Sequence, residues 1–216
     1  MASERSLQQT GELLKAVGDY YSEKLVTHGE TAKGVDWSTE ESQKLRFHEL
    51  SRVIDFDKSF TINDLGCGYG AYFNYLASRV ANFQYFGIDV SSPMIEAAKR
   101  RLADRENAQF LCGGVPEAVM DYTVASGIFN VRLHHSEQDW RDYFLSTIEM
   151  MNAKSKAGFS FNCLTSYSDA DRMRADLFYP NPGEIFDFCK RKFSRHVALL
   201  HDYGLYEFTI LVRKSI

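Results

Sequence analysis

The sequence contains few cysteines and no long apolar run. Its cysteines form no C-x-x-C pair, which excludes a zinc-finger pattern and a disulfide framework, so we expect no metal site. The four are Cys67, Cys112, Cys163 and Cys189. No segment reaches the ~18 apolar residues that a membrane-spanning helix needs, and residues 1–5 are too polar to open a signal peptide. These absences predict a reduced, cytoplasmic protein without a membrane partner.

The sequence also has no excess of positive charge. It carries 25 basic and 29 acidic residues, a formal net charge of -4. This balance gives no attraction across the whole chain toward nucleic acid or an anionic membrane. Two short basic stretches, residues 99–101 and 190–192, are interpreted as solvated helix faces. We expect no nucleic-acid partner, and the sequence leaves the oligomeric state open.

What is present is the composition of an ordinary globular protein, 44% hydrophobic and 25% charged. The 216 residues are enough for one α/β domain with a sizeable core. No repeat, low-complexity tract or long linker divides them. We predict a single domain over residues 1–216, in which residues 1–57 form an N-terminal helical lid and residues 58–216 form the core.

The first quarter of the chain has helical periodicity. Leu14, Val17 and Tyr21 recur on one face of a predicted helix. After a loop, Ser38 and Glu41 form a capping-box pattern that predicts the start of a second helix.

From residue 60 onward, short apolar runs alternate with helical periods, and Ser92 and Ser136 are each predicted to cap a helix. The first five strands are expected at residues 60–64, 84–88, 109–112, 122–129 and 158–163. Two more, at 196–202 and 205–212, flank the hairpin signal Tyr203-Gly204. The alternation predicts an α/β fold with a Rossmann-like, seven-stranded, mostly parallel sheet, helices on both faces and an antiparallel C-terminal strand.

The most informative segment is Ile-Asn-Asp-Leu-Gly-Cys-Gly-Tyr-Gly at residues 62–70. It follows a strand and enters a helix, where Gly66 and Gly68 let the backbone turn tightly and approach a ligand. Asp64 ends the strand, so its carboxylate could bind an ammonium group. Asp89 ends the next strand and is placed to accept hydrogen bonds from two ribose hydroxyls.

A nicotinamide enzyme is the first alternative, because Gly66, Gly68 and Ala71 also satisfy the relaxed dinucleotide pattern. Three features argue against it. Asp64 stands where a dinucleotide site more usually keeps an apolar residue, the loop begins far from the start of the chain, and no length is left for a separate substrate domain.

At these residues the sequence resembles the class I S-adenosylmethionine-dependent methyltransferases, over about residues 60–213. The matching motifs are residues 64–70, residues 87–89, the fourth strand with its end at 124–130, and the terminal hairpin. The resemblance implies S-adenosylmethionine as cofactor, with S-adenosylhomocysteine as product. It places the methionine half of the cofactor at the glycine loop and the ribose at the strand-end acid. The cofactor residues so implied are Asp64, Gly66, Gly68 and Asp89, and Cys67, Val90 and Asn130 beside these motifs are further cofactor candidates.

The sequence departs from the family after the third strand, where an acid often lies near the adenine amino group. Here that position is Cys-Gly-Gly at residues 112–114. The expectation is that backbone groups of Gly113, Gly114 and Val115, with apolar contact from Met94, hold the adenine instead.

The N-terminal helices are expected to cover the cofactor. Arg46 could pair with the cofactor carboxylate through a bidentate contact, or be an exposed helix arginine. Tyr21, Trp37 and Gln43 are further lid candidates, although packing in the core also explains Tyr21 and Trp37.

Catalytic and acceptor-binding candidates lie near the carboxyl edge of the sheet, where α/β proteins bind ligands. His134 and His135 follow the fourth strand and are candidate general bases, or else idle loop histidines. Tyr179, His201 and Tyr203 are acceptor-pocket candidates. The fourth strand lacks the Asn/Asp-Pro-Pro-aromatic motif of many enzymes that methylate amino groups of DNA bases.

The sequence therefore predicts an S-adenosylmethionine-dependent methyltransferase that acts on a small molecule with a hydroxyl, carboxylate or amine acceptor. A non-catalytic S-adenosylmethionine-binding protein of the same fold is one alternative. An aminopropyl-transferring relative is another, and it loses support if Arg46 binds the carboxylate of the cofactor.

Overall fold

The computed structural model of the chain describes residues 4–214. Seven strands form one sheet in the order β3-β2-β1-β4-β5-β7-β6. They are β1 Phe60–Leu65, β2 Phe83–Asp89, β3 Ala108–Cys112, β4 Met120–Ala125, β5 Ser155–Leu164, β6 His196–Leu200 and β7 Glu207–Arg213. Only β7 runs antiparallel to both of its neighbours. The predicted mostly parallel sheet with an antiparallel C-terminal strand is confirmed.

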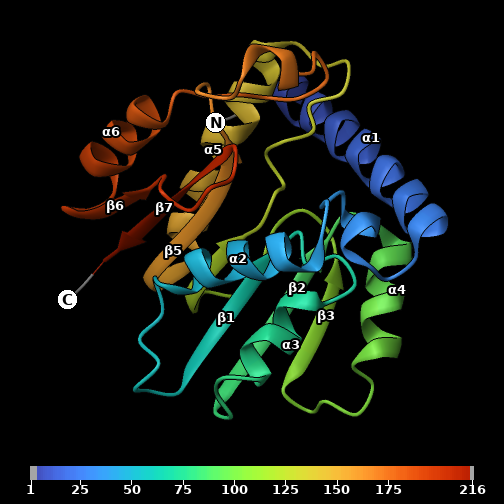
Figure 1. Cartoon of the computed structure of the whole chain (residues 1–216). Helices are drawn as coiled ribbons and strands as arrows, with labels where there is room; N and C mark the ends of the chain where they lie inside the picture. The colour runs from blue at the N-terminus through green and yellow to red at the C-terminus, as the bar shows by residue number, and fades with distance from the viewer. Residues whose placement is uncertain (1–3, 215–216) are drawn as a thin grey trace.

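Helices cover both faces of the sheet, with α2 and α3 in front and α5 behind in Figure 1. The helices are α1 Glu4–His28, α2 Glu40–Ser51, α3 Ala71–Ala77, α4 Ser92–Arg101, α5 Glu137–Ala153 and α6 Pro182–Lys192, with short 3-10 turns η1 Ala32–Val35 and η2 Ala170–Arg172. One apolar cluster joins the sheet to α2, α3 and α4, and another joins it to α1, α5 and α6. None of the helices in residues 4–214 is long and apolar enough to cross a membrane.

Two helix caps lie one residue away from their predicted positions. Helix α2 is capped by Thr39 rather than Ser38, because the Thr39 hydroxyl accepts the Ser42 N–H at 3.1 Å and Ser42 completes the capping box. Helix α4 is capped by Ser91 rather than Ser92, and the Ser91 hydroxyl accepts the Met94 N–H at 3.3 Å. The predicted Ser136 cap of α5 is confirmed.

The fourth strand is shorter than predicted, and this matters for the site. Strand β4 ends at Ala125 because Gly127 has a φ of 78° and turns the chain out of the sheet. The Gly127 N–H donates to the side-chain oxygen of Asn162 in β5 at 2.7 Å instead of to a backbone carbonyl of that strand. Residues 126–130 therefore form a loop over the carboxyl edge of the sheet. The terminal hairpin likewise has a longer connection than the predicted tight turn.

Helix α1 crosses this same carboxyl edge. Leu13 and Val17 pack in the cluster that contains α5, while Tyr21 and Leu25 pack against Met94 of α4. Leu14, Val17 and Tyr21 of α1 line one pocket together with Leu65 at the end of β1 and Asp89 at the end of β2. In Figure 1, α1 runs along the upper right of the molecule, next to α4.

Candidate functional site

The glycine loop after β1 is tightly wound. Gly66, Gly68 and Gly70 have φ values of 76°, 54° and 80°, in the left-handed region that favours glycine. A β-carbon on Gly66 would lie 2.1 Å from the Ile128 side chain, and one on Gly68 would lie 3.0 Å from Val35. The loop therefore runs close to both the β4 loop and the N-terminal segment, and larger residues would not fit at Gly66.

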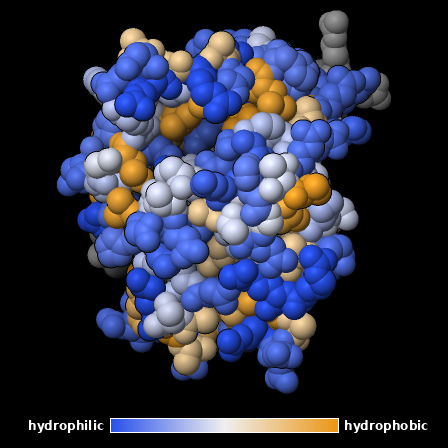
Figure 2. All heavy atoms as spheres, turned by 45° about the vertical axis from the view of Figure 1, so that its right-hand side comes forward, coloured by the Kyte–Doolittle hydropathy of each residue, from blue (hydrophilic) through white to orange (hydrophobic). Residues whose placement is uncertain are grey.

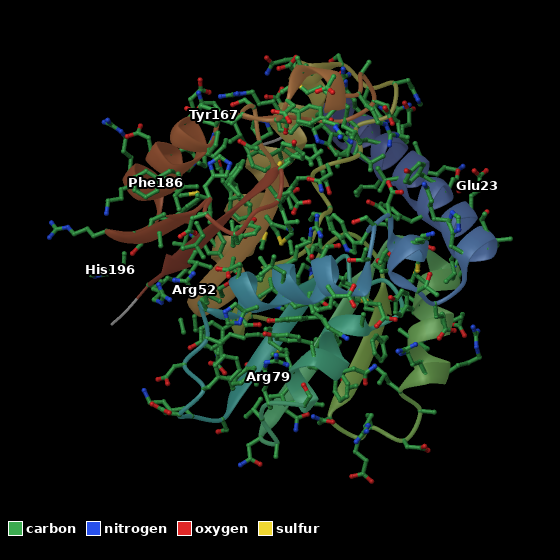
Figure 3. The ribbon with its side chains drawn as sticks, viewed as in Figure 1. Glu23, Arg52, Arg79, Tyr167, Phe186 and His196 are labelled. Carbon is green, nitrogen blue, oxygen red and sulfur yellow. The ribbon has the colours of Figure 1, made fainter. Side chains whose placement is uncertain are left out.

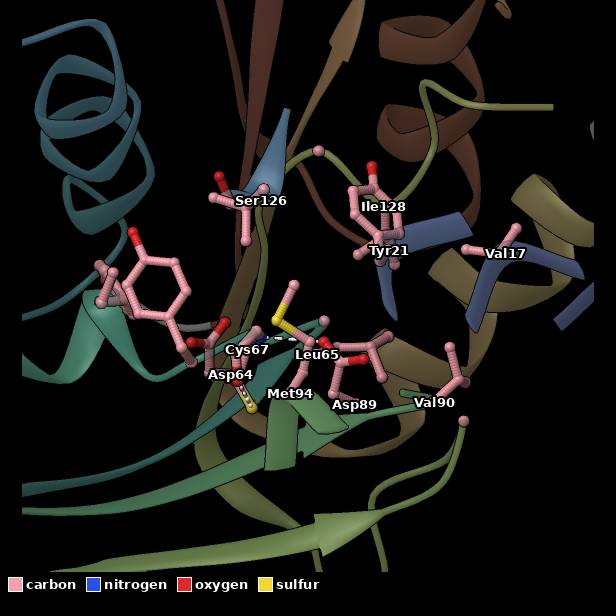
Figure 4. A pocket seen from close by; sticks show the side chains of 18 of the residues that line it. Val17, Tyr21, Asp64, Leu65, Cys67, Asp89, Val90, Met94, Ser126 and Ile128 are labelled. Atoms are coloured by element: carbon pink, nitrogen blue, oxygen red, sulfur yellow. Dashed lines mark hydrogen bonds between the residues drawn. The ribbon is translucent and has the colours of Figure 1, made fainter. Parts of the chain in front are cut away.

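Asp89 at the end of β2 is bound directly to this loop. One carboxylate oxygen accepts the Gly68 N–H at 2.9 Å and the other accepts the Ser91 N–H at 2.8 Å. Figure 4 shows Asp89 beside the glycine loop. The side chain is 9% exposed, and burial raises its pKa above the ordinary value. A carboxylate has about four lone-pair positions, so these two bonds orient Asp89 and leave acceptor capacity for hydroxyl donors such as those of a ribose.

Asp64 at the end of β1 faces the same crevice from a fully buried position. Its carboxyl accepts a hydrogen bond from the Tyr85 hydroxyl at 2.5 Å. Burial raises the pKa of Asp64 to about 7, the Tyr85 hydrogen bond opposes this rise, and the charge of Asp89 adds to it. The buried Ser126 hydroxyl also borders the crevice and has no hydrogen-bond partner among the described residues. An acid and an unpartnered hydroxyl together fit an ammonium group, which donates to both.

The crevice between these groups is a pocket of about 860 Å³, including its open mouth. Figure 4 shows Asp64, Asp89 and Met94 around the pocket, with Tyr21 and Val17 of α1 nearby. On the surface of the molecule, Figure 2 shows hydrophobic atoms in a hollow in the upper part of a largely hydrophilic face.

Most of the predicted cofactor residues line this one pocket. They are Tyr21, Trp37, Gln43, Asp64, Gly66, Cys67, Gly68, Asp89, Val90, Met94, Gly113 and Gly114. Residues that are far apart in the chain, from α1 to the end of β3, are thus brought together. The wall combines apolar side chains, glycine backbone and two acids, which is the chemistry that an adenosyl group with a charged end needs.

The structure corrects the prediction for Arg46. Its guanidinium binds Glu207 of β7, with Nε 3.0 and 2.9 Å from the two carboxylate oxygens and Nη2 2.6 Å from one of them. It also stacks on the Trp37 ring at 3.8 Å. Arg46 is 7% exposed and does not line the pocket, so it is neither the exposed arginine nor the free cation that the sequence suggested. A buried carboxylate of the chain itself neutralises it.

Val115 and Asn130, two other cofactor candidates, lie outside the pocket wall. Val115 is 55% exposed, because the chain after Gly114 turns outward. The Asn130 side chain is committed to the fold, where its oxygen accepts the Leu164 N–H at 3.1 Å. Its backbone oxygen accepts the Phe178 N–H at 2.9 Å. Asn130 therefore ties the β4 loop to β5 and to the segment before α6.

The two predicted catalytic histidines also lie outside the pocket. Leu133, with a φ of 54°, turns the chain away from the sheet edge before His134 is reached. His134 is exposed and its ring stacks on that of His135, with centroids 4.5 Å apart. Burial and the neighbouring His134 lower the pKa of His135. Neither imidazole lines the pocket.

The three acceptor-pocket candidates have structural partners instead. The Tyr179 hydroxyl accepts the Arg174 N–H at 3.0 Å, and the Tyr203 hydroxyl lies 3.0 Å from that of Thr209. His201 is exposed and packs on Tyr167, which sits on the outside of the molecule in Figure 3. None of the three side chains lines the pocket, which their positions in the sequence could not show.

Other pocket residues were not predicted. They are Leu14, Val17, Val35, Phe47, Leu65, Tyr69, Ala71, Tyr72, Ser126, Gly127, Ile128 and Tyr143. Three of them, residues 126–128, could have been predicted, because they directly follow β4 at the carboxyl edge of the sheet. Tyr143 comes from the middle of α5, and nothing in its local sequence separates it from a core residue.

The contact between Gly127 and the Trp37 ring gives a testable prediction. A β-carbon on Gly127 would lie 2.4 Å from the ring, so Gly127→Ala must displace Trp37 from the pocket roof. We expect a loss of about 1–3 kcal/mol in the free energy of unfolding, from the left-handed backbone and the overpacking together. Denaturant titration followed by tryptophan fluorescence measures both the loss and the changed environment of the ring.

Gly204→Ala is the matched control, because Gly204 has a φ of 73° and nothing within 4 Å of an added β-carbon. It carries only the backbone penalty and should leave Trp37 fluorescence unchanged. Equal effects of the two substitutions on stability and fluorescence would contradict the contact.

No three His, Cys, Asp or Glu side chains are grouped as metal ligands anywhere in the described part of the chain.

Comparison with known proteins identifies the family of this chain. The profile of the family described as "Methyltransferase domain" matches residues 62–154. The protein named "Putative methyltransferase Rv1506c", from Mycobacterium tuberculosis, is 56% identical over 164 residues, which are 76% of this chain and 99% of that protein.

Solved structures share the fold at low sequence identity. The N-methyltransferase NodS from Bradyrhizobium japonicum, in complex with S-adenosylhomocysteine, aligns with a TM-score of 0.64 at 14% identity, over 92% of this chain and 98% of NodS. A DhpI complex with S-adenosylhomocysteine aligns with a TM-score of 0.63 at 13% identity, over 94% and 97% of the two chains. The glycine loop, the strand-end acid, the sheet order and the close relative agree: this chain belongs to the class I S-adenosylmethionine-dependent methyltransferases.

Proposed function

We propose that the protein transfers the methyl group of S-adenosylmethionine to a small molecule that offers a hydroxyl, carboxylate or amine. The observation that carries the proposal is the roof of the pocket, where Tyr21, Val35 and Trp37 from the N-terminal segment cover the sheet edge. A covered pocket admits a small acceptor more readily than a folded macromolecule. The net charge of -4 also provides no attraction to nucleic acid.

The cofactor residues have distinct proposed roles. Asp89 would accept the ribose hydroxyls, and Asp64 with Ser126 would bind the amino group of the methionine end. Gly68 brings the backbone close to the ligand without a side chain. Met94 and Gly113 would contact the adenine.

Proposed catalysis rests on positioning. The bound sulfonium supplies an activated methyl group, and the chain holds the acceptor in line with it. The pocket wall formed by the described residues contains no histidine, since His134 and His135 lie outside it. The pocket residue Tyr143 is a poor base, because burial raises its pKa to about 12. The chain thus contributes orientation and exclusion of water.

We further propose that residues 1–57 act as a lid on a core of residues 58–216 within one domain. Residues of helix α1 and Trp37 line the pocket, which supports a role for them in covering the bound cofactor. Residues 1–3 and 215–216 of these ranges lie outside the described residues.

The proposal is tested with S-adenosylmethionine labelled in its methyl group and a cell extract divided by ultrafiltration into small metabolites and macromolecules. We expect label to enter the small-metabolite fraction, and the Asp89→Ala variant to transfer none. Transfer only into protein or nucleic acid would contradict a small acceptor.

A non-catalytic S-adenosylmethionine-binding protein is the second candidate, favoured by the position of both histidines outside the pocket. Cofactor binding without transfer to any fraction would support it. Arg46 gives no evidence against the aminopropyl-transferring alternative, because its guanidinium is bound by Glu207 and not by a carboxylate of the cofactor. Competition between S-adenosylmethionine and its decarboxylated form measures which cofactor the site prefers.

A further inference from the structure

Tyr85 lies in the middle of β2, beneath the glycine loop, and is completely buried. It does not line the pocket, yet its hydroxyl donates a hydrogen bond to Asp64 at 2.5 Å. Its ring is held by edge-on contacts with Phe73 at 5.4 Å and Phe110 at 5.9 Å. The hydroxyl is thus held in one position, with its proton directed at the Asp64 carboxyl group, and Tyr85 itself lies outside the pocket wall.

The other titratable groups that face Asp64 have partners of their own. Asp89 accepts the N–H groups of Gly68 and Ser91, and the Tyr72 hydroxyl lies 2.8 Å from that of Ser51. The Cys67 thiol is 3.5 Å from the Gly68 carbonyl oxygen. Among the described residues, Tyr85 is therefore the side chain that hydrogen-bonds Asp64.

We propose that Tyr85 is a positioning residue that orients Asp64 and stabilises its anionic form for a cationic group of the bound cofactor. The proposal rests on the proposed role of Asp64 toward the methionine amino group. A donor to a carboxylate favours the charged form, whereas burial and the negative charge of Asp89 favour the neutral one. The Tyr85 hydrogen bond opposes the effects of burial and of Asp89, so without it the pKa of Asp64 would be higher and the carboxyl group would stay protonated to a higher pH.

The consequence is cofactor binding that depends on pH. Burial raises the pKa of Asp64 to about 7, and a bound cation favours the anionic carboxylate. Binding therefore releases a proton below pH 7 and none well above it. By linkage, the association constant should be nearly constant above about pH 7 and fall about tenfold for each pH unit below it.

The experiment compares wild type with Tyr85→Phe, which removes the hydroxyl and keeps the packed ring. Calorimetric titration with S-adenosylhomocysteine from about pH 5 to pH 8 gives the midpoint of the pH dependence. We expect it to move upward by about one pH unit in Tyr85→Phe, the size expected for losing one hydrogen bond to a charged group. Asp64→Asn should abolish the dependence.

Tyr122→Phe is the matched control, because Tyr122 is a buried tyrosine in the same apolar cluster whose hydroxyl accepts the Asp55 N–H at 3.0 Å. Its loss should leave the midpoint unchanged. The same midpoint in wild type, Tyr85→Phe and Tyr122→Phe would overturn the proposal.

A second readout separates this inference from the proposed function. NMR titration of the aspartate carboxyl carbons in the protein alone reports the pKa of Asp64 without any cofactor. An upward shift in Tyr85→Phe supports the inference, and no shift overturns it, even if the protein were found to bind neither S-adenosylmethionine nor S-adenosylhomocysteine. That lack of binding would instead contradict the proposed function.

Discussion

Replacing Glu207 by alanine is expected to lower the free energy of unfolding by about 3–5 kcal/mol, because it leaves the buried Arg46 charge without its counter-ion. The two side chains are 2% and 7% exposed and share a bidentate ion pair. The Glu207 carboxylate also accepts the Asn162 side-chain N–H at 2.8 Å, and Asn162 accepts the Gly127 N–H. One substitution thus loosens α2, β5 and the β4 loop together. Urea denaturation followed by circular dichroism measures the loss.

The control for Glu207→Ala is Arg141→Ala, which breaks a largely exposed pair with Glu184 at 3.2 Å. It should change stability by less than about 1 kcal/mol. The double variant Arg46→Met with Glu207→Leu removes both buried charges, so it should be more stable than Glu207→Ala, which leaves one of them unpaired. A loss below about 1 kcal/mol in Glu207→Ala would contradict a stabilising role of the buried pair between α2 and β7.

Asp89→Ala is expected to weaken the binding of S-adenosylhomocysteine by about 100-fold or more. Two hydrogen bonds to a charged acceptor contribute about 1.5–3 kcal/mol each, and a loss of about 3 kcal/mol is already more than 100-fold in affinity. The same substitution frees the Gly68 N–H and loosens the glycine loop, which adds to the effect. Calorimetry measures the dissociation constant directly.

Asp121→Ala is the control for Asp89→Ala, because it lowers stability without removing a residue of the pocket. The Asp121 carboxylate accepts the backbone N–H and the hydroxyl of Thr61, each at 2.8 Å, near the start of β1 and away from the pocket. It should reduce stability and leave affinity nearly unchanged. Comparable losses of affinity in both variants would show that Asp89 acts only through the fold.

The fold could be predicted from the sequence because its signals are local. Strand and helix periods repeat along residues 60–213, and they predict a parallel sheet whose carboxyl edge must carry the ligand. That rule, the glycine-rich motif and the family resemblance together predicted Asp64, the glycine loop and Asp89, and Gly68 does donate to Asp89. The errors in the caps of α2 and α4 are shifts of one residue, where two adjacent polar residues compete for one position.

The partner of Arg46 could not be predicted, for a physical reason. A buried guanidinium needs a carboxylate, and the sequence cannot show whether a ligand or a residue 161 positions away supplies it. The position of His134 and His135 outside the pocket could not be predicted for a similar reason, because a single residue with left-handed backbone, Leu133, redirects the chain before them. Long-range pairing and single backbone reversals are properties of the folded chain.

The most direct test of the central claim is a crystal structure of the protein grown with S-adenosylhomocysteine. We expect the ribose hydroxyls within hydrogen-bonding distance of Asp89 and the amino group near Asp64 and Ser126, under the roof formed by Trp37 and α1. Adenosyl density outside this crevice, or a crevice closed by the protein's own side chains with the ligand bound elsewhere, would contradict the account.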